Sequence, residues 1–343
     1  MRITIGYVLS KHKVEVLKLA ELNAYEQRGY TFRSIPIDPT IDLTCQERCD
    51  VIFHKIHDVL VDEKNYTDKR AVYNQIEKFT AQARLLKTVL LDRWSQIEVL
   101  TSRVKCAEII QNLEFELNGV TVASPKTFLY DAPLKNESFL EALASHSISF
   151  PFLAKPTGGV LARSRYDMSI HFANECPGYR NVVDQLSNSV PCVIQQFFNH
   201  GGVLYKLYVI GDYYGVSVRP SIVDLDNTSD AIFFKSNHIS RIYGTCGVTS
   251  SSVPPSNLKS LLGPSNVPTS LDMEVIGELV KRFKEKVYLE LVGLDIIHHI
   301  PSNTYYVVDI NYLPGFKGIP DVRSKLVDVF IKVHNASLNN GYA

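Results

Sequence analysis

The segment 307–315, Val-Val-Asp-Ile-Asn-Tyr-Leu-Pro-Gly, is an apolar strand that carries two polar residues and stops at a Pro-Gly pair. Side chains alternate along a strand, so Asp309 and Asn311 are expected on the same face. A carboxylate and an amide oxygen that project together at a strand end suit a hard cation such as Mg²⁺. A second apolar strand, 291–297, holds Asp295, and a lone buried carboxylate is costly without a cation nearby. The pattern predicts two neighbouring strands with a metal between them, and a turn that begins at Asp309 and is capped by Asn311 is the plainer alternative.

The first hundred residues alternate between strand and helix patterns. Strands are predicted at 3–9, 31–37, 50–56 and 88–91, with helical spacing at 14–22 and 66–83. This alternation predicts an N-terminal α/β domain with a mainly parallel sheet over residues 1–102.

The rest of the chain is richer in strands. They are predicted at 120–124, 126–130, 150–155, 168–172, 191–197, 203–210 and 213–219, with helices at 98–113, 137–145 and 276–287. Gly211-Asp212 joins two of the strands as a tight hairpin turn. We expect a central domain at 103–200 and a C-terminal domain at 201–343. The stretch at about 244–270 is rich in Ser, Pro and Gly, which predicts an exposed or disordered insertion.

Composition narrows the classes of partner. Lys plus Arg and Asp plus Glu both number 36, so the chain is formally neutral and is not expected to bind nucleic acid through bulk charge. The six cysteines form no C-x-x-C pair, which indicates reduced thiols rather than a zinc site or disulfides. No run approaches the ~20 apolar residues of a membrane span. We expect a soluble monomer in the cytoplasm, with the nucleus as a second location.

Several strand ends carry cations that suit phosphate. Lys155 ends an apolar strand and is followed by Gly158-Gly159, Arg163 and Arg165, a pattern that fits phosphate contacts but taken alone fits a solvated turn better. Lys206 lies mid-strand between aromatic residues, where it either extends its ammonium to solvent or contacts an anion.

Other segments add nucleotide-like features. The run Gln195-Gln196-Phe197-Phe198-Asn199-His200 could hold a purine between aromatic rings and backbone groups, and Arg219-Pro220-Ser221 and the hydroxyls of Ser236 and Ser240 add further donors. Strand-end cations in front of a paired Asp/Asn site fit phosphoryl transfer with a Mg-nucleotide best. The chain lacks the P-loop motif G-x-x-x-x-G-K-S/T and the protein-kinase H-R-D and D-F-G motifs, which excludes those two classes.

Together these segments resemble the inositol-tetrakisphosphate 1-kinases, also called inositol trisphosphate 5/6-kinases, which have the ATP-grasp fold. The resemblance covers nearly the full length of the chain. It rests on Gly6 to Ser10 with Lys13, Val51 to Ile56 with Asp58, Phe150 to Lys155, Gln195 to Lys206, Arg219 to Ser221, Phe233 to Ser240, Gly293 to Ile297 and Asp309 to Gly315. The combination of N-H-x-x-V-L-Y-K at 199–206 with D-I-N-Y-x-P-G at 309–315 is highly specific to this family.

The resemblance implies an α/β (α+β) ATP-grasp fold of three domains, in which the antiparallel sheets of the central and C-terminal domains sandwich ATP. ATP would be contacted by Arg103, Lys155, Gln195, Gln196, Phe197, Phe198, Ser221, Ser236 and Ser240. Two Mg²⁺ ions would be held by Asp295, Asp309 and Asn311, with Asp309 bridging them. An inositol tris- or tetrakisphosphate would be bound by Lys13, Lys55, His200, Lys206, Asn311 and Gly315. Lys206, Arg219 and Asp309 would take the catalytic roles, with Arg219 neutralising the transferring phosphoryl group.

The loop 156–168 departs from the family pattern. Tyr166 stands where the family usually has a histidine, and the glycines are shifted towards Lys155. Arg163 and Arg165, with Tyr166, could replace the missing substrate contact. The expected function is an active inositol polyphosphate kinase, with a catalytically weakened inositol-phosphate-binding protein or another ATP-grasp ligase as alternatives.

Overall fold

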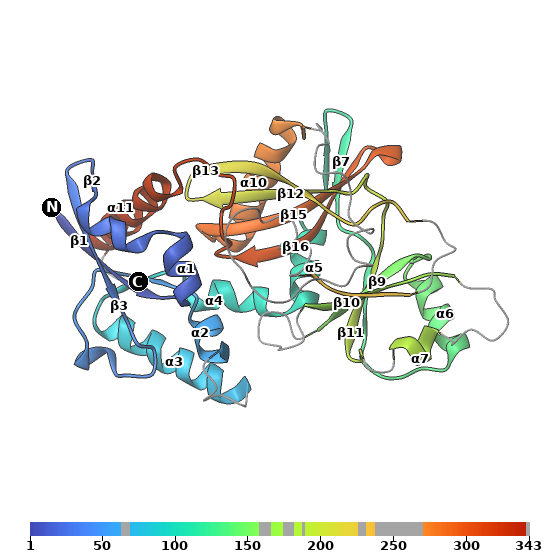
Figure 1. Ribbon diagram of the computed structural model, residues 1–343, viewed down its shortest axis with the longest axis horizontal. Helices are drawn as coiled ribbons and strands as arrows, with labels where there is room; N and C mark the ends of the chain where they lie inside the picture. Colours follow the sequence, from blue (N-terminus) through green and yellow to red (C-terminus); the bar gives the residue numbers. More distant parts are fainter. Residues whose placement is uncertain are drawn as a thin grey trace.

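The computed structural model describes residues 1–62, 69–157, 166–173, 182–186, 189–225, 231–236 and 270–340. Three β-sheets organise these residues (Figure 1). The N-terminal sheet and its helices lie at one end of the molecule, the central sheet lies at the other, and the C-terminal sheet lies between them. The three layers therefore meet around the middle of the molecule.

The N-terminal sheet has the strand order β2-β3-β1-β4-β5, and all its pairs are parallel except β2–β3. Its strands are β1 (Arg2–Val8), β2 (Glu26–Gln27), β3 (Tyr30–Pro36), β4 (Val51–His54) and β5 (Val89–Leu91). Its helices are α1 (Lys11–Val16), α2 (Ile56–Asp62) and α3 (Lys69–Leu85), with 3-10 turns at Leu19–Ala24 and Leu43–Cys45. The Ser10 side chain caps α1 by accepting the Lys13 backbone N–H at 3.4 Å. The predicted mainly parallel sheet is confirmed.

A short helical region connects this domain to the rest of the chain. It contains α4 (Trp94–Ile97), a 3-10 turn at Glu98–Thr101 and α5 (Arg103–Gln111). The single helix predicted at 98–113 is wrong in this respect, because Ser102 interrupts it. The Ser102 side chain accepts the Lys105 N–H at 3.4 Å and starts a new helix, which places Arg103 at its first position.

The central sheet is antiparallel, in the order β14-β10-β9-β11-β8. Its strands are β8 (Thr127–Tyr130), β9 (Phe152–Pro156), β10 (Asp167–His171), β11 (Cys192–Gln196) and β14 (Ile232–Lys235), and its helices are α6 (Asn136–Ser145) and α7 (Val182–Leu186). The buried rings of Tyr130, Phe139 and Phe152 form the centre of its core. This core covers one face of the sheet and leaves β9 and β11 to present polar side chains to the next domain.

The C-terminal sheet has the order β13-β12-β15-β16-β7-β6. Its strands are β6 (Phe115–Leu117), β7 (Val120–Ala123), β12 (Val203–Ile210), β13 (Tyr213–Pro220), β15 (Leu291–His299) and β16 (Thr304–Tyr312). Helix α10 (Met273–Val287) is capped by Asp272, which accepts the Glu274 N–H at 2.8 Å, and it buries Val275, Leu279 and Phe283. The chain reaches β16 from β15 through a 3-10 turn at Ile300–Ser302.

The sheets do not follow the predicted domain boundaries. Strands β6 and β7 fall within 103–200 but extend the C-terminal sheet, in which β7 is parallel to β16. Strand β14 falls beyond residue 200 but pairs with β10 in the central sheet. The domain division at 103–200 and 201–343 stays a prediction. Sheet membership crosses it, because pairing between distant strands, which local pattern does not reveal, decides which sheet a strand joins. The predicted insertion at 244–270 lies outside the described residues, apart from Ser270.

The C-terminal helix α11 (Val322–Asn340) packs against β4 and β5 of the N-terminal domain (Figure 1). The Phe330 ring meets the Phe53 ring edge-on with centroids 5.5 Å apart. The Tyr30 hydroxyl donates to Asn335 Oδ1 at 3.0 Å. Helix α11 is thus part of the packed N-terminal domain, although it is far from that domain in the sequence. In the described ranges, no helix combines the length and apolarity that a membrane-spanning segment needs.

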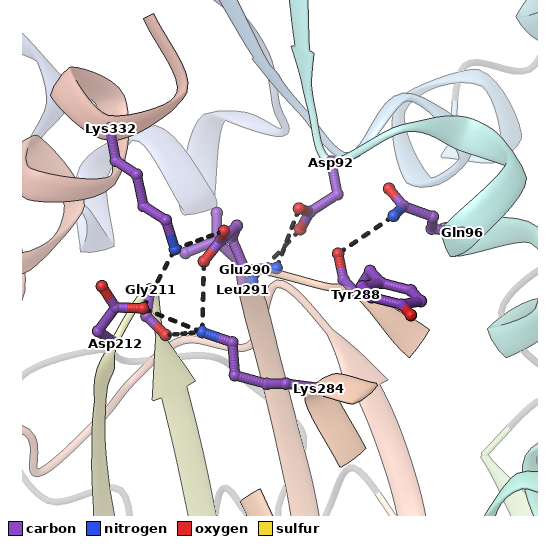
Figure 2. A network of polar contacts seen from close by, with 9 residues as sticks. All are labelled: Asp92, Gln96, Gly211, Asp212, Lys284, Tyr288, Glu290, Leu291 and Lys332. Carbon is purple, nitrogen blue, oxygen red and sulfur yellow. Dashed lines mark hydrogen bonds and ion pairs between the residues drawn. The ribbon is translucent and has the colours of Figure 1, made fainter. Parts of the chain in front are cut away.

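A polar network joins the N-terminal domain to the C-terminal sheet (Figure 2). Lys332 on α11 pairs with Glu290 at 2.8 Å and with Asp212 at 3.1 Å, and Lys284 on α10 pairs with Asp212 at 3.2 Å. Asp92, just after β5, points its carboxylate at the backbone N–H groups where β15 begins. The network holds two helices and the β12–β13 turn at one end of the sheet that carries Asp295.

Candidate active site

The two acidic strands are neighbours, as the sequence predicted. Asp295 on β15 lies directly opposite Asp309 on β16 in an antiparallel register. The Asn311 amide lies two residues further on, with Nδ2 3.4 Å from Asp309 Oδ2. Because β16 continues to Tyr312, the alternative of a turn at these residues is wrong.

Cations from two other elements contact the acidic pair. Lys206 on β12 donates to both oxygens of Asp295 at 2.8 Å, and Arg103 on α5 lies 3.5 Å from Asp309. Burial disfavours both charges of the Lys206–Asp295 pair and raises the pKa of Asp295, while attraction to Asp295 outweighs burial and raises the pKa of Lys206. Two facing carboxylates are thus neutralised by two side-chain cations.

The donor set fits a hard divalent cation. Two carboxylates and one amide oxygen meet at adjacent strand positions, and oxygen ligands of this kind bind Mg²⁺. Among the described residues no group of three His, Cys, Asp or Glu side chains has metal-binding geometry, since the third ligand here is an amide. The cluster therefore has the oxygen ligands of a magnesium site rather than the His and Cys ligands of a zinc site.

A cavity of about 610 Å³ opens in front of the acidic pair and is lined by all three domains. Its charged side chains are five Lys or Arg residues and three Asp residues, an excess of two positive charges. They are Lys13, Lys55, Arg103, Lys155, Lys206, Asp58, Asp295 and Asp309. A chain with no net charge therefore concentrates positive charge at one place, which suits a polyanionic ligand.

Lys155 lies between the metal-type ligands and the central sheet. Its Nζ donates to the Val308 carbonyl at 3.0 Å, one residue before Asp309. Burial lowers the pKa of Lys155 to about 8, although Asp309 opposes the shift. An anionic ligand beside this ammonium would restore its charge, so the position favours phosphate.

The strand β11 and the segment after it form the other wall of the cavity. Gln195, Gln196, Phe197 and Phe198 all line it. His200 is buried, with Nδ1 2.8 Å from the Phe198 carbonyl and Nε2 2.8 Å from Ser221 Oγ. The Phe198 ring stacks on Tyr306 of β16 at 4.0 Å. These contacts fix the connection between the central and C-terminal sheets.

Two lysines of the N-terminal domain close the end of the cavity. Lys13 Nζ donates to the Leu313 carbonyl, and Lys55 pairs with Asp58 at 3.0 Å. Burial lowers the pKa of Lys13 to about 7, and the charge of Lys55 adds to this. Lys13 is therefore poised to gain a full charge when an anion enters.

The sequence profile of the inositol 1,3,4-trisphosphate 5/6-kinase ATP-grasp domain matches residues 120–332 of the chain. The chain belongs to this family. The match covers the central sheet and every strand of the C-terminal sheet except β6.

Proteins named inositol-tetrakisphosphate 1-kinase match over nearly the whole chain. The one from Danio rerio is 29% identical over 99% of this chain and 81% of its own length, and inositol-tetrakisphosphate 1-kinase 2 of Glycine max is 26% identical over 97% and 95%. A Chryseobacterium gregarium ATP-grasp ligase solved in complex with ADP and a leader and core peptide superposes with a TM-score of 0.56 and 12% identity, covering 97% of each chain. The ATP-grasp fold is confirmed.

The structure brings most residues expected from this family resemblance to one cavity. They are Lys13, Lys55, Arg103, Lys155, Tyr166, Gln195, Gln196, Phe197, Phe198, His200, Lys206, Ser221, Ser236, Asp295, Asp309, Asn311 and Gly315. Arg219 is not in the described lining, because its guanidinium donates to the Lys317 carbonyl at 2.6 Å in the loop after β16. Arg163, Arg165 and Ser240 lie outside the described residues.

Sequence reasoning missed what some residues do to hold the site together. Asp58 was named only as part of a motif, but it lines the cavity and pairs with Lys55, and its place three residues after that lysine was the available signal. Asp92 and the Tyr312 hydroxyl join the N-terminal domain to the acidic strands. Tyr312 was interpreted only as part of a motif. Asp92 follows a short apolar strand, and local pattern could not reveal its distant partners.

Proposed function

We propose that the protein transfers the terminal phosphoryl group of ATP to a hydroxyl of a soluble inositol tris- or tetrakisphosphate. The observation that carries this proposal is the cavity in which five cations from three domains face the Asp295–Asp309 pair. A carboxylate–amine ligase needs no such excess of cations at the acceptor end. The proposed monomeric state and cytoplasmic location stay predictions.

The nucleotide would lie between the central and C-terminal sheets. The backbone of Gln195 to Phe198 would bind the adenine, since the Gln196 side chain is already engaged with the backbone of Ser149 and Pro151. Lys155 and Arg103 would contact the phosphates. Ser221, held by His200, and Ser236 would line the same side.

Asp295, Asp309 and Asn311 would hold two Mg²⁺ ions, which would neutralise the ATP phosphates and orient the transferring group. Lys206 and Arg103 now contact the two carboxylates, so each would be released towards phosphate oxygens as the metal charge replaces theirs. The catalytic role proposed for Lys206 follows from this exchange.

The acceptor would lie at the end of the cavity lined by Lys13, Lys55, Tyr166 and Gly315. Lys13 would leave the Leu313 carbonyl for a substrate phosphate. Arg219 would act on the acceptor site through the loop that it holds, because its contact to Lys317 lies two residues beyond Gly315. Catalysis here rests on positioning and charge neutralisation, with the attacking hydroxyl and the leaving ADP held in line.

The test is phosphate transfer by the purified protein with Mg-ATP and a panel of inositol tris- and tetrakisphosphates, read by chromatography of the products. Asp309→Ala should abolish transfer while the circular dichroism spectrum stays unchanged. Asp328→Ala is the matched control, because Asp328 pairs with Arg28 and Gln27 and is not among the residues that line the cavity. Wild-type protein that leaves the whole panel unchanged would refute the kinase proposal.

A further inference from the structure

One group of hydrogen bonds joins the substrate lysines of the N-terminal domain to the strands that carry the metal-type ligands. The Tyr312 hydroxyl accepts the Asp92 backbone N–H at 2.9 Å and donates to the Leu91 carbonyl at 3.0 Å. The Asp92 carboxylate accepts the N–H groups of Glu290 at 3.0 Å and Leu291 at 3.3 Å (Figure 2). We call Asp92, Tyr312 and these four hydrogen bonds the interdomain clamp.

The clamp engages both acidic strands at the same end. Glu290 and Leu291 are where β15 begins, and Tyr312 is where β16 ends, and the two positions are adjacent because Leu313 N–H donates to the Leu291 carbonyl at 2.9 Å. Asp295 lies four residues from Leu291, roughly 13 Å at the rise of a strand. Asn311 directly precedes Tyr312. The clamp therefore sets where the N-terminal domain lies relative to the ends of the two strands that carry the metal-type ligands.

The clamp also lies close to the two substrate lysines of the N-terminal domain. His54 Nε2 is 2.8 Å from the Asp92 carbonyl, and Lys55 is the next residue. Burial lowers the pKa of His54 to about 4, so the ring is neutral and Nε2–H donates this bond. Phe53 pairs with Leu91 in the N-terminal sheet, which fixes the two strand ends side by side. Lys13 reaches the same place through the Leu313 carbonyl.

The clamp is buried, so water does not replace its bonds. Tyr312 is 2% exposed and Asp92 is 4% exposed. The Tyr312 ring packs near His54 and His57, with centroids 6.5 Å and 6.3 Å away. Removing the hydroxyl leaves a buried N–H and a buried carbonyl without their partner, while the ring can keep its packing.

We propose that Tyr312 and Asp92 are positioning residues for the acceptor, which set Lys13 and Lys55 at the distance from Asp309 and Asn311 that an inositol phosphate must span. The inference rests on the proposed function for the nature of the acceptor. The nucleotide site is formed by the other two sheets and does not depend on this contact. Loss of a hydrogen bond from the clamp should therefore weaken acceptor binding and leave nucleotide binding unchanged.

The test compares Tyr312→Phe with Tyr30→Phe. Both variants remove one hydroxyl from the contact between the N-terminal domain and the C-terminal part of the chain, but Tyr30 bonds Asn335 on α11, away from the acidic strands. Calorimetry measures the affinity for an inositol tetrakisphosphate and, separately, for a non-hydrolysable Mg-ATP analogue. Amide hydrogen exchange of Glu290 reports whether the clamp has opened.

Tyr312→Phe is expected to weaken inositol tetrakisphosphate binding by about five- to tenfold, to change nucleotide affinity less than about twofold and to speed exchange at Glu290. Tyr30→Phe should leave all three unchanged. Unchanged acceptor affinity in Tyr312→Phe, or equal loss for acceptor and nucleotide, would overturn the proposal. Wild-type protein that binds the acceptor without transferring phosphate would refute the kinase proposal, and the affinity comparison would still decide the role of the clamp.

Discussion

The ion pair between Lys206 and Asp295 gives the sharpest test of the electrostatics of the site. Both side chains are largely buried, with 21% and 17% of their surfaces exposed, and Asp309 lies opposite Asp295. Lys206→Met removes the ammonium and keeps the length of the side chain. Asp295 then loses the cation that contacts it, while Arg103 keeps its contact with Asp309.

Removing one partner of a buried ion pair costs about 3–5 kcal/mol. Since this pair keeps partial contact with solvent, we expect the lower end, about 3 kcal/mol, in the absence of divalent metal. Mg²⁺ should recover much of this loss, because it supplies the missing positive charge to the same carboxylate. At a metal concentration a hundred times the dissociation constant, binding alone stabilises by about 2.7 kcal/mol.

The assay is urea unfolding followed by tryptophan fluorescence and circular dichroism, with EDTA and with increasing Mg²⁺. The wild type should gain less from Mg²⁺ than Lys206→Met, because in the wild type the metal must displace Lys206. Lys281→Met is the control, since Lys281 makes an exposed pair with Glu278 at 3.5 Å, and its loss should change stability by less than about 1 kcal/mol. Equal stabilisation of wild type and Lys206→Met by Mg²⁺ would refute the idea that the lysine and the metal compete for Asp295.

Two further predictions concern pH. Because the pKa of Lys13 is lowered to about 7, binding of an inositol phosphate at pH 8 should be accompanied by proton uptake in the wild type and by less proton uptake in Lys13→Arg. Calorimetry in buffers of different ionisation enthalpy measures this uptake. Equal uptake by the two proteins would contradict the role of Lys13. Burial raises the pKa of Asp92 from 3.8 to about 7, so the folded state holds this proton more tightly than the unfolded state, and its stabilising contribution is present below pH 4 and lost as the pH rises through 7. Between pH 5.5 and 8 the wild type should therefore lose about 2 kcal/mol of its free energy of unfolding relative to Asp92→Asn, whose side chain cannot titrate. If the free energy of unfolding of the two proteins changed in parallel with pH, the pKa of Asp92 would not be raised in this way.

Local pattern was enough to predict that the two acidic strands are neighbours. Alternation along one strand placed Asp309 and Asn311 together, and an isolated acid on a second strand identified Asp295 as their neighbour. Hairpin and helix signals gave β12, β13 and α10 within a few residues of their observed ends. These features depend on interactions within a short stretch of chain, so a single sequence carries them.

Contacts between distant segments could not be predicted in the same way. Nothing in the residues of β7 indicates that its partner is β16, nearly two hundred positions later, or that β14 returns to the central sheet. The register that brings Asp92 to Glu290 depends on how two whole sheets dock. The resemblance implied that Arg219 neutralises the transferring phosphoryl group, whereas in the structure its guanidinium donates to the Lys317 carbonyl in the loop after β16, a contact between distant segments.

The pairing of β7 with β16, and the packing of α11 on β4 and β5, bear on how this chain is made by the ribosome. The N-terminal strands leave the exit tunnel long before residues 304–340 are synthesised, so neither their sheet nor the C-terminal one can make these contacts until that segment has been translated. Contacts of such large sequence separation slow folding. Nascent chains that stop before β16 should accordingly remain sensitive to protease in the N-terminal and C-terminal sheets, and these two sheets should acquire resistance only after residues 304–340 have been added.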